Sequence, residues 1–309
     1  MLNQLFSTSR PIGYILIAAA LLIAYSLNLF SETSWMTDST ELAKKIVLFF
    51  VMVLSVFLVQ FISVKNHLHS NSLYSLYFYS CFLLLFPSYF DNNKIILANF
   101  FVLLGLRRLF SMHSMLVPKQ KLFDASLWFL LASIFNSWLI LFLVMVYMAI
   151  IWYVSEDYTN WLIPLIACAV VAVLFYTYGL ATDFDFILYW KEKFDWSLDF
   201  QYFDNNYQRI ALSGFVALVC LFIVRQIALM KNAPIHQHKL YKNILMCFII
   251  GALVYLFSFP KFNASLVYTF FPLSIAASNF VLSIDQKWLK EVVMIGVLIF
   301  SVLIFFMQL

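Results

Sequence analysis

The sequence predicts an all-α fold, a polytopic transmembrane helical bundle of about eleven spans (10–12), with the N-terminus inside and the C-terminus outside. Three observations lead to this prediction. Of the 309 residues, 64% are hydrophobic and only 11% are charged, whereas a soluble domain carries roughly 25% charged residues. Apolar runs of ~20 residues, long enough to cross a bilayer, recur along the chain. Lysine and arginine are also more frequent in alternate connections between these runs.

The apolar runs fill most of the chain, so we expect one integral membrane domain over residues 1–309. The first run extends from Pro11 to Phe30, which is too long for the apolar region of a signal peptide, and we expect it to remain as a span. The expected spans are 11–30, 46–64, 72–90, 94–112, 122–136, 138–154, 161–182, 209–230, 241–258, 264–283 and 288–307.

Some of these spans carry features that interrupt a helix. The fifth and sixth are short and are separated only by Asn136 and Ser137. They fit either a tight helical hairpin or one re-entrant feature, and the sequence leaves both open. Pro87, Pro164 and Pro272 lie within other spans, where proline removes a backbone hydrogen bond and is expected to kink or open the helix.

The distribution of positive charge predicts the orientation. With the N-terminus inside, the inner connections hold twelve lysine and arginine residues and the outer connections hold seven. This agrees with the excess of positive charge found on the cytoplasmic side of membrane proteins. The net charge of +4 therefore reflects topology, and we expect membrane lipids, not nucleic acid, as partners. No ionisable residue lies in the middle of a span, which disfavours ion-coupled transport.

Cysteines and histidines point to no metal site. The four cysteines lie within expected spans and lack CxxC spacing. Two HxH pairs occur, His67 with His69 and His236 with His238, but no carboxylate or cysteine lies near either pair to complete a coordination sphere. We therefore expect these histidines to contact solvent and lipid headgroups, and we assign no metal ligands.

The inner connection 107–121 is basic, with Arg107 and Arg108 at its start. Topology alone explains positive residues beside anionic headgroups, where each contributes ~1 kcal/mol of attraction to the membrane surface. The same two arginines are also candidates for binding a phosphate group.

The outer connection 183–208 is expected to lie at the membrane interface. Asp183 and Asp185 open it, and two such carboxylates can hold a divalent cation together with a phosphate. No cofactor is certain from the sequence, and a divalent cation is the one that this pair suggests. Between Phe194 and Tyr202 apolar and polar residues alternate, which is typical of an extended segment with one apolar face. The segment fits either an interfacial anchor or a platform for a substrate or partner. Its candidate interface residues are Phe194, Trp196, Asp199, Tyr202 and Asp204, and Arg209 is a candidate phosphate ligand.

Three stretches resemble an uncharacterised family of inner-membrane proteins from Flavobacteria and other Bacteroidota. They are NFFVLLGLRRLFSMHSMLVPKQKLFDASLWFLLASIF (99–135), DYTNWLIPL (157–165) and FQYFDNNYQRIALS (200–213). The resemblance covers most of the chain and implies a multi-pass protein of the bacterial inner (cytoplasmic) membrane. More distantly, residues 121–147 are similar to the short paired helices of C-superfamily membrane glycosyltransferases and polysaccharide polymerases. Those proteins keep a catalytic acid in a long first outer loop. Here that loop, 31–45, is short, and Asp38 is the position that maps to the acid.

Three functions are compatible with these observations, and whether the protein is an enzyme stays open. The first is a glycosyltransferase-like or polymerase-like activity on lipid-linked glycan at the outer face, with Asp38 or the Asp183–Asp185 pair as base or cation ligands and Arg209 on a phosphate. The second is a non-catalytic subunit or scaffold of an envelope or protein-export complex, whose partners are other envelope membrane proteins. The third, a carrier for a neutral or lipidic solute, is the weakest, because neither matching helix breaks nor buried charges mark a pathway.

Overall fold

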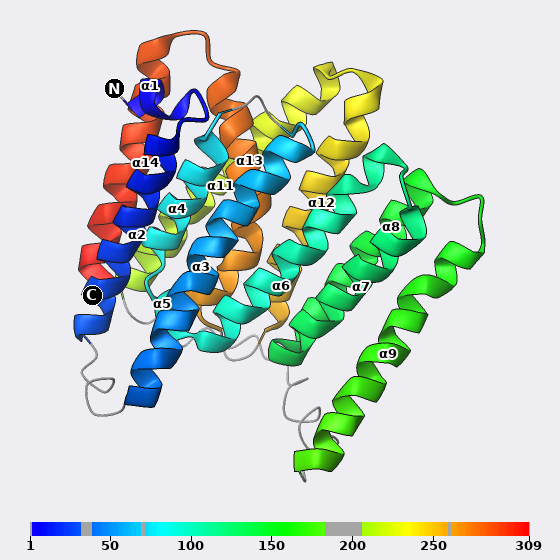
Figure 1. Cartoon of the computed structure of the whole chain (residues 1–309). Helices are drawn as coiled ribbons and strands as arrows, with labels where there is room; N and C mark the ends of the chain where they lie inside the picture. Colours follow the sequence, from blue (N-terminus) through cyan, green and yellow to red (C-terminus); the bar gives the residue numbers. More distant parts are fainter. Residues whose placement is uncertain (1, 32–38, 69–71, 183–205, 259–260, 309) are drawn as a thin grey trace.

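The computed structural model describes residues 2–31, 39–68, 72–182, 206–258 and 261–308. Within these ranges the chain is helical and contains no β-strand, and most successive helices run in opposite directions through the bundle (Figure 1). The elements are α1 (Leu2–Phe6), α2 (Pro11–Ser31), α3 (Ser39–Lys65), α4 (Tyr74–Leu85), α5 (Ser88–Asp91), α6 (Asn93–Phe110), η2 (Ser111–Ser114), α7 (Pro118–Phe135), η3 (Ser137–Phe142), α8 (Leu143–Tyr153), α9 (Thr159–Thr182), α11 (Asn206–Asn232), α12 (Ile235–Phe257), η5 (Asn263–Leu266), α13 (Val267–Leu282) and α14 (Lys287–Gln308).

Eight helices of the described residues are long and apolar enough to cross a membrane. They are α2, α3, α6 with η2, α9, α11, α12, η5 with α13, and α14. At 1.5 Å per residue, such helices cover the ~30 Å hydrocarbon core of a bilayer. The chain is therefore a multi-pass membrane protein, as its composition predicts. The expected count of eleven spans is not confirmed, and the orientation and the identity of the membrane stay predictions.

The expected span 72–90 is interrupted. It contains α4, which ends at Leu85 after 12 residues, a length of about 18 Å. Pro87 then precedes the single turn of α5. Because proline has no N–H to donate, the helical ladder stops before it. Pro164 and Pro272, by contrast, lie inside α9 and α13, which continue past them.

The expected spans 122–136 and 138–154 correspond to α7 and to η3 followed by α8. Asn136 separates them and has an extended backbone, and α7 packs against both η3 and α8. The two segments therefore form a tight helical hairpin (Figure 1). In α7 the charged residues Lys119, Lys121 and Asp124 occupy the first two turns, and this helix is not among the eight candidate spans.

The core of the bundle is built around α4 and α13. Eleven of the 12 residues of α4 are buried. This helix packs against α3, α13 and α14, while α13 also packs against α11 and α12. Aromatic rings fill the space between them. The ring of Phe270 on α13 lies 5.8, 5.9 and 5.6 Å from the rings of Phe82, Phe86 and Phe215. In lipid, where the hydrophobic effect does not drive helices together, such packing supplies much of the attraction between them.

Several glycines permit close contacts between segments, and Gly105 and Gly251 show the two kinds. A Cβ atom at Gly105 on α6 would lie 2.5 Å from the ring of Phe129 on α7. A Cβ atom at Gly251 on α12 would lie 2.7 Å from the main-chain oxygen of Tyr268 on α13. The first glycine therefore makes room for an aromatic ring, and the second lets two backbones approach each other.

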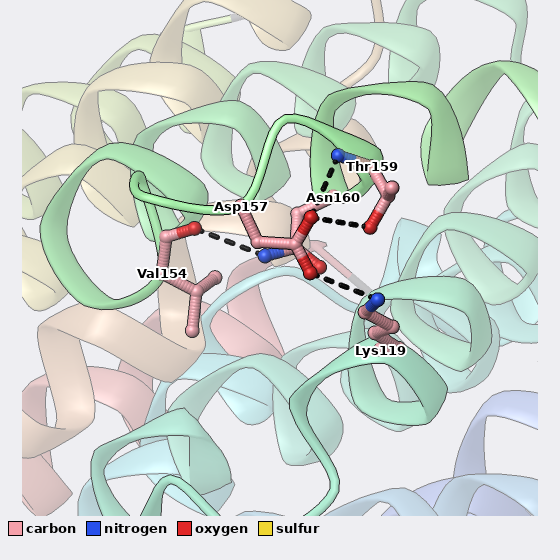
Figure 2. A network of polar contacts seen from close by, with 5 residues as sticks. All are labelled: Lys119, Val154, Asp157, Thr159 and Asn160. Carbon is pink, nitrogen blue, oxygen red and sulfur yellow. Dashed lines mark hydrogen bonds and ion pairs between the residues drawn. The ribbon is translucent and has the colours of Figure 1, made fainter.

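Helix α9 stands at the edge of the bundle, where its main contacts are with α7 and α8 (Figure 1). A polar network fixes its first turn (Figure 2). The carboxylate of Asp157 accepts hydrogen bonds from the backbone N–H and the hydroxyl of Thr159, at 3.0 and 2.7 Å, and it lies 2.8 Å from Nζ of Lys119. The side chain of Asn160 donates to the carbonyl of Val154, just after α8, at 3.0 Å. The connection between α8 and α9 is thus held against the start of α7.

Among the described residues, lysine and arginine are more frequent at one end of the bundle than at the other. One end carries α1, the last turns of α3, α6 and α11, and the first turns of α7, α12 and α14 (Figure 1). We call it the basic end, because these turns and their flanks hold Lys65, Arg107, Arg108, Lys119, Lys121, Arg225, Lys231, Lys239, Lys242, Lys287 and Lys290. The charge rule for membrane proteins predicts that this end faces the cytosol.

Candidate anion-binding site

A cavity of about 420 Å³ opens at the basic end. Three segments form it: the end of α3, the junction of α6 with η2, and the loop that leads into α7. Its lining residues are Lys65, Asn66, Arg108, Ser111, His113, Ser114, Leu116, Val117, Gln120 and Lys121. We call this cavity the basic pocket. Its volume falls in the range of ~300–1,000 Å³ that is usual for small-molecule sites.

Three cations from separate helices meet in the basic pocket. Lys65 is the last residue of α3, Arg108 lies in the last turn of α6, and Lys121 lies in the first turn of α7. Helix α6 packs against both α3 and α7, so the fold brings these side chains together from distant parts of the sequence.

Lys121 is held in place by η2. Its ammonium group donates hydrogen bonds to the carbonyl of Ser111 and to the hydroxyl of Ser114, both at 2.7 Å. Burial lowers the pKa of Lys121, and the positive charges of Arg108 and Lys65 lower it further. An anion in the pocket would offset this repulsion and favour the charged lysine.

One carboxylate partly balances these cations. Asp124 of α7 lies 3.0 Å from Nε of Arg108. Among the described residues, neither Lys65 nor Lys121 forms an ion pair with a carboxylate, so the basic pocket keeps a net positive charge. Arg107 points to a different neighbour, with its guanidinium 4.9 Å from the centre of the Phe61 ring.

The backbone around the basic pocket adopts a conformation that L-amino acids rarely take. His67, Met115 and Val117 have φ values of 52°, 53° and 48°, and within the described ranges they are the non-glycine residues with positive φ. This left-handed region costs roughly 1–2 kcal/mol per residue and is least favourable for a β-branched side chain such as that of Val117. Val117 lines the pocket, and His67 directly follows its lining residue Asn66. Backbone strain of this kind concentrates at functional sites.

The chemistry of the basic pocket suits an anion. Ammonium and guanidinium groups form charge-assisted hydrogen bonds with phosphate oxygens, and basic pockets between membrane helices bind phosphate-bearing headgroups. The pocket is lined by no carboxylate, and the described part of the chain contains no group of three or more His, Cys, Asp or Glu residues that could hold a metal ion. The described side chains therefore support anion binding at this end.

The full chain, residues 1–309, matches a protein family described as Family of unknown function, DUF6427. The chain belongs to this family. Comparison with curated proteins and with solved structures gives no match. Membership of DUF6427 confirms the expectation of an uncharacterised family that extends over most of the chain. The origin in Flavobacteria and the similarity to glycosyltransferases stay predictions for this DUF6427 protein.

The arginines predicted to bind phosphate lie at opposite ends of this DUF6427 protein. Arg107 and Arg108 are in the last turn of α6, at the basic end, whereas Arg209 is in the first turn of α11, at the other end (Figure 1). Arg108 lines the basic pocket, and Arg107 contacts the Phe61 ring beside it. Arg209 is therefore separate from this pocket.

The other predicted site residues lie outside the described ranges. They are Asp38, Asp183, Asp185, Phe194, Trp196, Asp199, Tyr202 and Asp204. Helix α11 begins at Asn206 and so includes the last three residues of the expected outer loop 183–208. Gln208, in the first turn of α11, accepts a hydrogen bond from Asn263 of η5, which ties this turn to the bundle.

Sequence reasoning did not single out Lys65 and Lys121 as site residues. Both lysines were expected in inner connections, because positive residues are more frequent there. For Lys121, the signal in the sequence was the basic character of residues 107–121. Lys65 comes from a different helix, and only the packing of α3 against α6 brings it to the basic pocket of this DUF6427 chain.

Proposed function

We propose that this DUF6427 protein recognises a phosphate-bearing ligand at the basic end of its membrane-embedded bundle. The convergence of Lys65, Arg108 and Lys121 on one pocket carries the proposal. If the positive residues served only to orient the protein in the membrane, their side chains would not need to converge on one pocket. Lys231 and Lys287, for example, contribute to the same bias but line no part of the pocket.

Titration of the purified protein in neutral detergent with glycerol 3-phosphate tests this proposal. Binding should raise the stability by about 2.7 kcal/mol when the ligand concentration is 100 times Kd. Replacing one cation that contacts the phosphate should weaken binding about tenfold or more, and we expect this of Lys65→Gln. The matched control is Lys231→Gln, which removes an exposed charge at the same end and should leave Kd unchanged. Absence of binding, or equal weakening by both variants, would contradict the proposal.

A transfer reaction on lipid-linked glycan at the outer face is the chemical role that the sequence favours. It rests on the resemblance to membrane glycosyltransferases and on a set of candidate residues. Asp38 or the Asp183–Asp185 pair would act as base or cation ligands, and Arg209 would bind a phosphate. The double replacement of Asp183 and Asp185 by alanine, made in a strain that depends on the protein, tests it. Surface glycan should be lost or altered, whereas Asp285→Ala, at an exposed acid near α14, should preserve it. Unchanged glycan in the double variant would rule out this role for the pair.

A second candidate function is that of a non-catalytic subunit of a membrane assembly. The position of α9 favours it, since this helix stands at the edge of the bundle and exposes apolar side chains along its length. Leu165, Val173 and Leu180, for instance, are about 60% exposed (59%, 61% and 65%). A stable partner should then remain after extraction in mild detergent. Recovery of a monodisperse monomer under those conditions would argue against this function.

A further inference from the structure

A second cavity lies beside the basic pocket, between α2 and α3. It has a volume of about 560 Å³. Tyr14 of α2 and Phe57, Phe61 and Val64 of α3 give it a largely apolar lining, and Lys65 stands at one of its ends. We call it the α2–α3 groove. Lys65 lines both cavities, so the groove and the basic pocket meet at this residue.

The groove extends from the basic end into the expected hydrocarbon region. From Lys65 back to Phe57, helix α3 rises about 12 Å along its axis. Helix α3 is among the candidate spans, and its side chains Leu54 and Phe61 are 53% and 42% exposed. The two cavities together therefore offer a positively charged compartment at the end of the bundle and an apolar one below it.

Phe61 lines the groove directly beside the cations of the basic end. Its ring lies 5.2 Å from Nζ of Lys65 and 4.9 Å from the guanidinium carbon of Arg107. Cations over an aromatic face are held near the ring by electrostatic attraction. This arrangement keeps positive charge at the end of the groove that lies nearest the basic end of the bundle. The headgroup of a lipid whose acyl chain lay in the groove would be at this position.

We infer that the basic pocket and the α2–α3 groove together bind one anionic glycerophospholipid. Its phosphate lies among Lys65, Arg108 and Lys121, and one of its acyl chains lies along Phe57, Phe61 and Val64. The inference rests on the proposed function and names a lipid, instead of a water-soluble compound, as the source of the phosphate. Charge complementarity carries the headgroup assignment, and the shared residue Lys65 carries the connection to the groove.

The selectivity of this site comes from its headgroup contacts. An acyl chain gains little by moving from the bilayer to the groove, because lipid tails are as apolar as the side chains that line it. A lysine or arginine beside an anionic headgroup contributes about a fivefold preference. We therefore expect the lipid to be chosen by its charge and to be oriented by the groove.

The experiment uses the full-length protein in nanodiscs that contain phosphatidylglycerol and phosphatidylcholine. Native mass spectrometry measures which lipid stays bound, and the glycerol 3-phosphate titration is repeated on each variant in detergent. The wild type should retain phosphatidylglycerol over phosphatidylcholine. Lys65→Gln should reduce this preference about fivefold or more and should also weaken glycerol 3-phosphate binding.

Two tryptophan substitutions on α3 separate the groove from the pocket. Val64→Trp fills the groove without a change of charge. A lipid whose phosphate lies in the pocket must place an acyl chain in the groove, so this variant excludes the whole lipid by steric clash. It should therefore lose the preference for phosphatidylglycerol and keep glycerol 3-phosphate binding intact. Leu54→Trp is at an exposed position of α3 that lines neither cavity, and it should change neither measurement. Similar unfolding temperatures for the two variants would establish that both are folded.

The outcomes distinguish this inference from the proposed function. If Val64→Trp retains phosphatidylglycerol like the wild type while Lys65→Gln weakens glycerol 3-phosphate binding, the lipid inference is overturned and phosphate recognition stands. If neither measurement responds to Lys65→Gln, both are overturned. In nanodiscs that also contain a polyprenyl phosphate, preferential retention of that lipid over phosphatidylglycerol would overturn the assignment to a glycerophospholipid.

Discussion

The ammonium group of Lys119 lies 2.8 Å from the carboxylate of Asp157, and this ion pair joins the start of α7 to the connection that precedes α9 (Figure 2). Thr159 donates two further hydrogen bonds to the same carboxylate. The hydrogen bond from Lys119 and then those from Thr159 lower the pKa of Asp157 to about 2. A helix at the edge of the bundle is thus fixed at its first turn by a charged contact.

This contact predicts a pH dependence with a definite sign. The folded protein holds the Asp157 carboxyl group in its ionised form at lower pH than the unfolded chain does, where the pKa is about 3.9. The stability that the group contributes is therefore complete above about pH 4 and is lost as the pH falls towards 2. We expect Asp157→Asn to lower the thermal unfolding temperature at about pH 6 and to have a smaller effect near pH 2. Glu156→Gln, at the exposed neighbouring acid, is the control and should change neither value. An equal effect of Asp157→Asn at both pH values would show that its charge contributes nothing.

Gly251 should be the least replaceable of the helical glycines described above. Pro272 has no N–H, so the carbonyl of Tyr268 lacks the donor that an α-helix normally supplies four residues later, and this oxygen faces Gly251. Gly251→Ala should destabilise the protein by about 1–3 kcal/mol through overpacking, as measured by unfolding in mixed micelles. At Gly296, where a Cβ atom would meet nothing within 4 Å, alanine should stabilise α14 by up to ~1 kcal/mol. Equal effects at the two sites would contradict the close contact between α12 and α13.

A buried amide connects three segments of the core. The side chain of Asn99 on α6 donates to the hydroxyl oxygens of Tyr79 on α4 and Tyr89 on α5, at 2.8 and 3.3 Å. Asn99→Leu should therefore cost about 1–2 kcal/mol of stability. Because the bond to Tyr79 is shorter, Tyr79→Phe should cost more than Tyr89→Phe, and the double variant with Asn99→Leu should be less destabilised than the sum of the single changes. The reverse order for the two tyrosines would show that Asn99 is bonded mainly to Tyr89.

The strained turn before α7 makes a prediction about stability. Glycine at position 117 would remove the left-handed strain of roughly 1–2 kcal/mol, although it adds entropy to the unfolded chain. We expect Val117→Gly to raise the stability by a net ~0.5–1 kcal/mol. Leu116→Gly, at the preceding exposed position with negative φ, should lower it. Destabilisation by both glycines would show that the Val117 side chain stabilises the turn.

The positions of the helices could be predicted closely from the apolar runs of the sequence. In lipid every spanning segment must satisfy its own backbone hydrogen bonds, so a long apolar run forms a helix. The expected span 288–307 corresponds to α14, Lys287–Gln308, and 94–112 corresponds to α6, Asn93–Phe110. Helix α3 begins at Ser39, seven residues before the expected start of the span at 46. Charged residues such as Glu41, Lys44 and Lys45 end an apolar window, but they do not prevent helix formation in an aqueous or interfacial region.

The basic pocket was only partly predictable. Arg108 was a phosphate candidate because of its place in a basic connection, but its partner Lys65 arrives through contacts between α3 and α6 that no local pattern encodes. The turn at Val117 is harder still to predict, since a β-branched residue disfavours the backbone conformation that it adopts there. Hydrogen bonds from Lys121 to Ser111 and Ser114 span this turn, and conflicts between local and global structure occur most often at functional sites.

Helix α4 is too short to cross ~30 Å of hydrocarbon, yet it need not perturb the thickness of the surrounding bilayer. A short helix in contact with lipid draws the two leaflets together or tilts its neighbours, whereas α4 is enclosed by α3, α13 and α14. Its interrupted end is shielded as well. The carbonyl of Leu85, whose usual helical donor Tyr89 bonds instead to Phe86, accepts a hydrogen bond from the side chain of Gln308 at 3.2 Å. The long helices α3 and α14 can therefore match an ordinary membrane on their outer surfaces while an irregular main chain is kept out of contact with lipid.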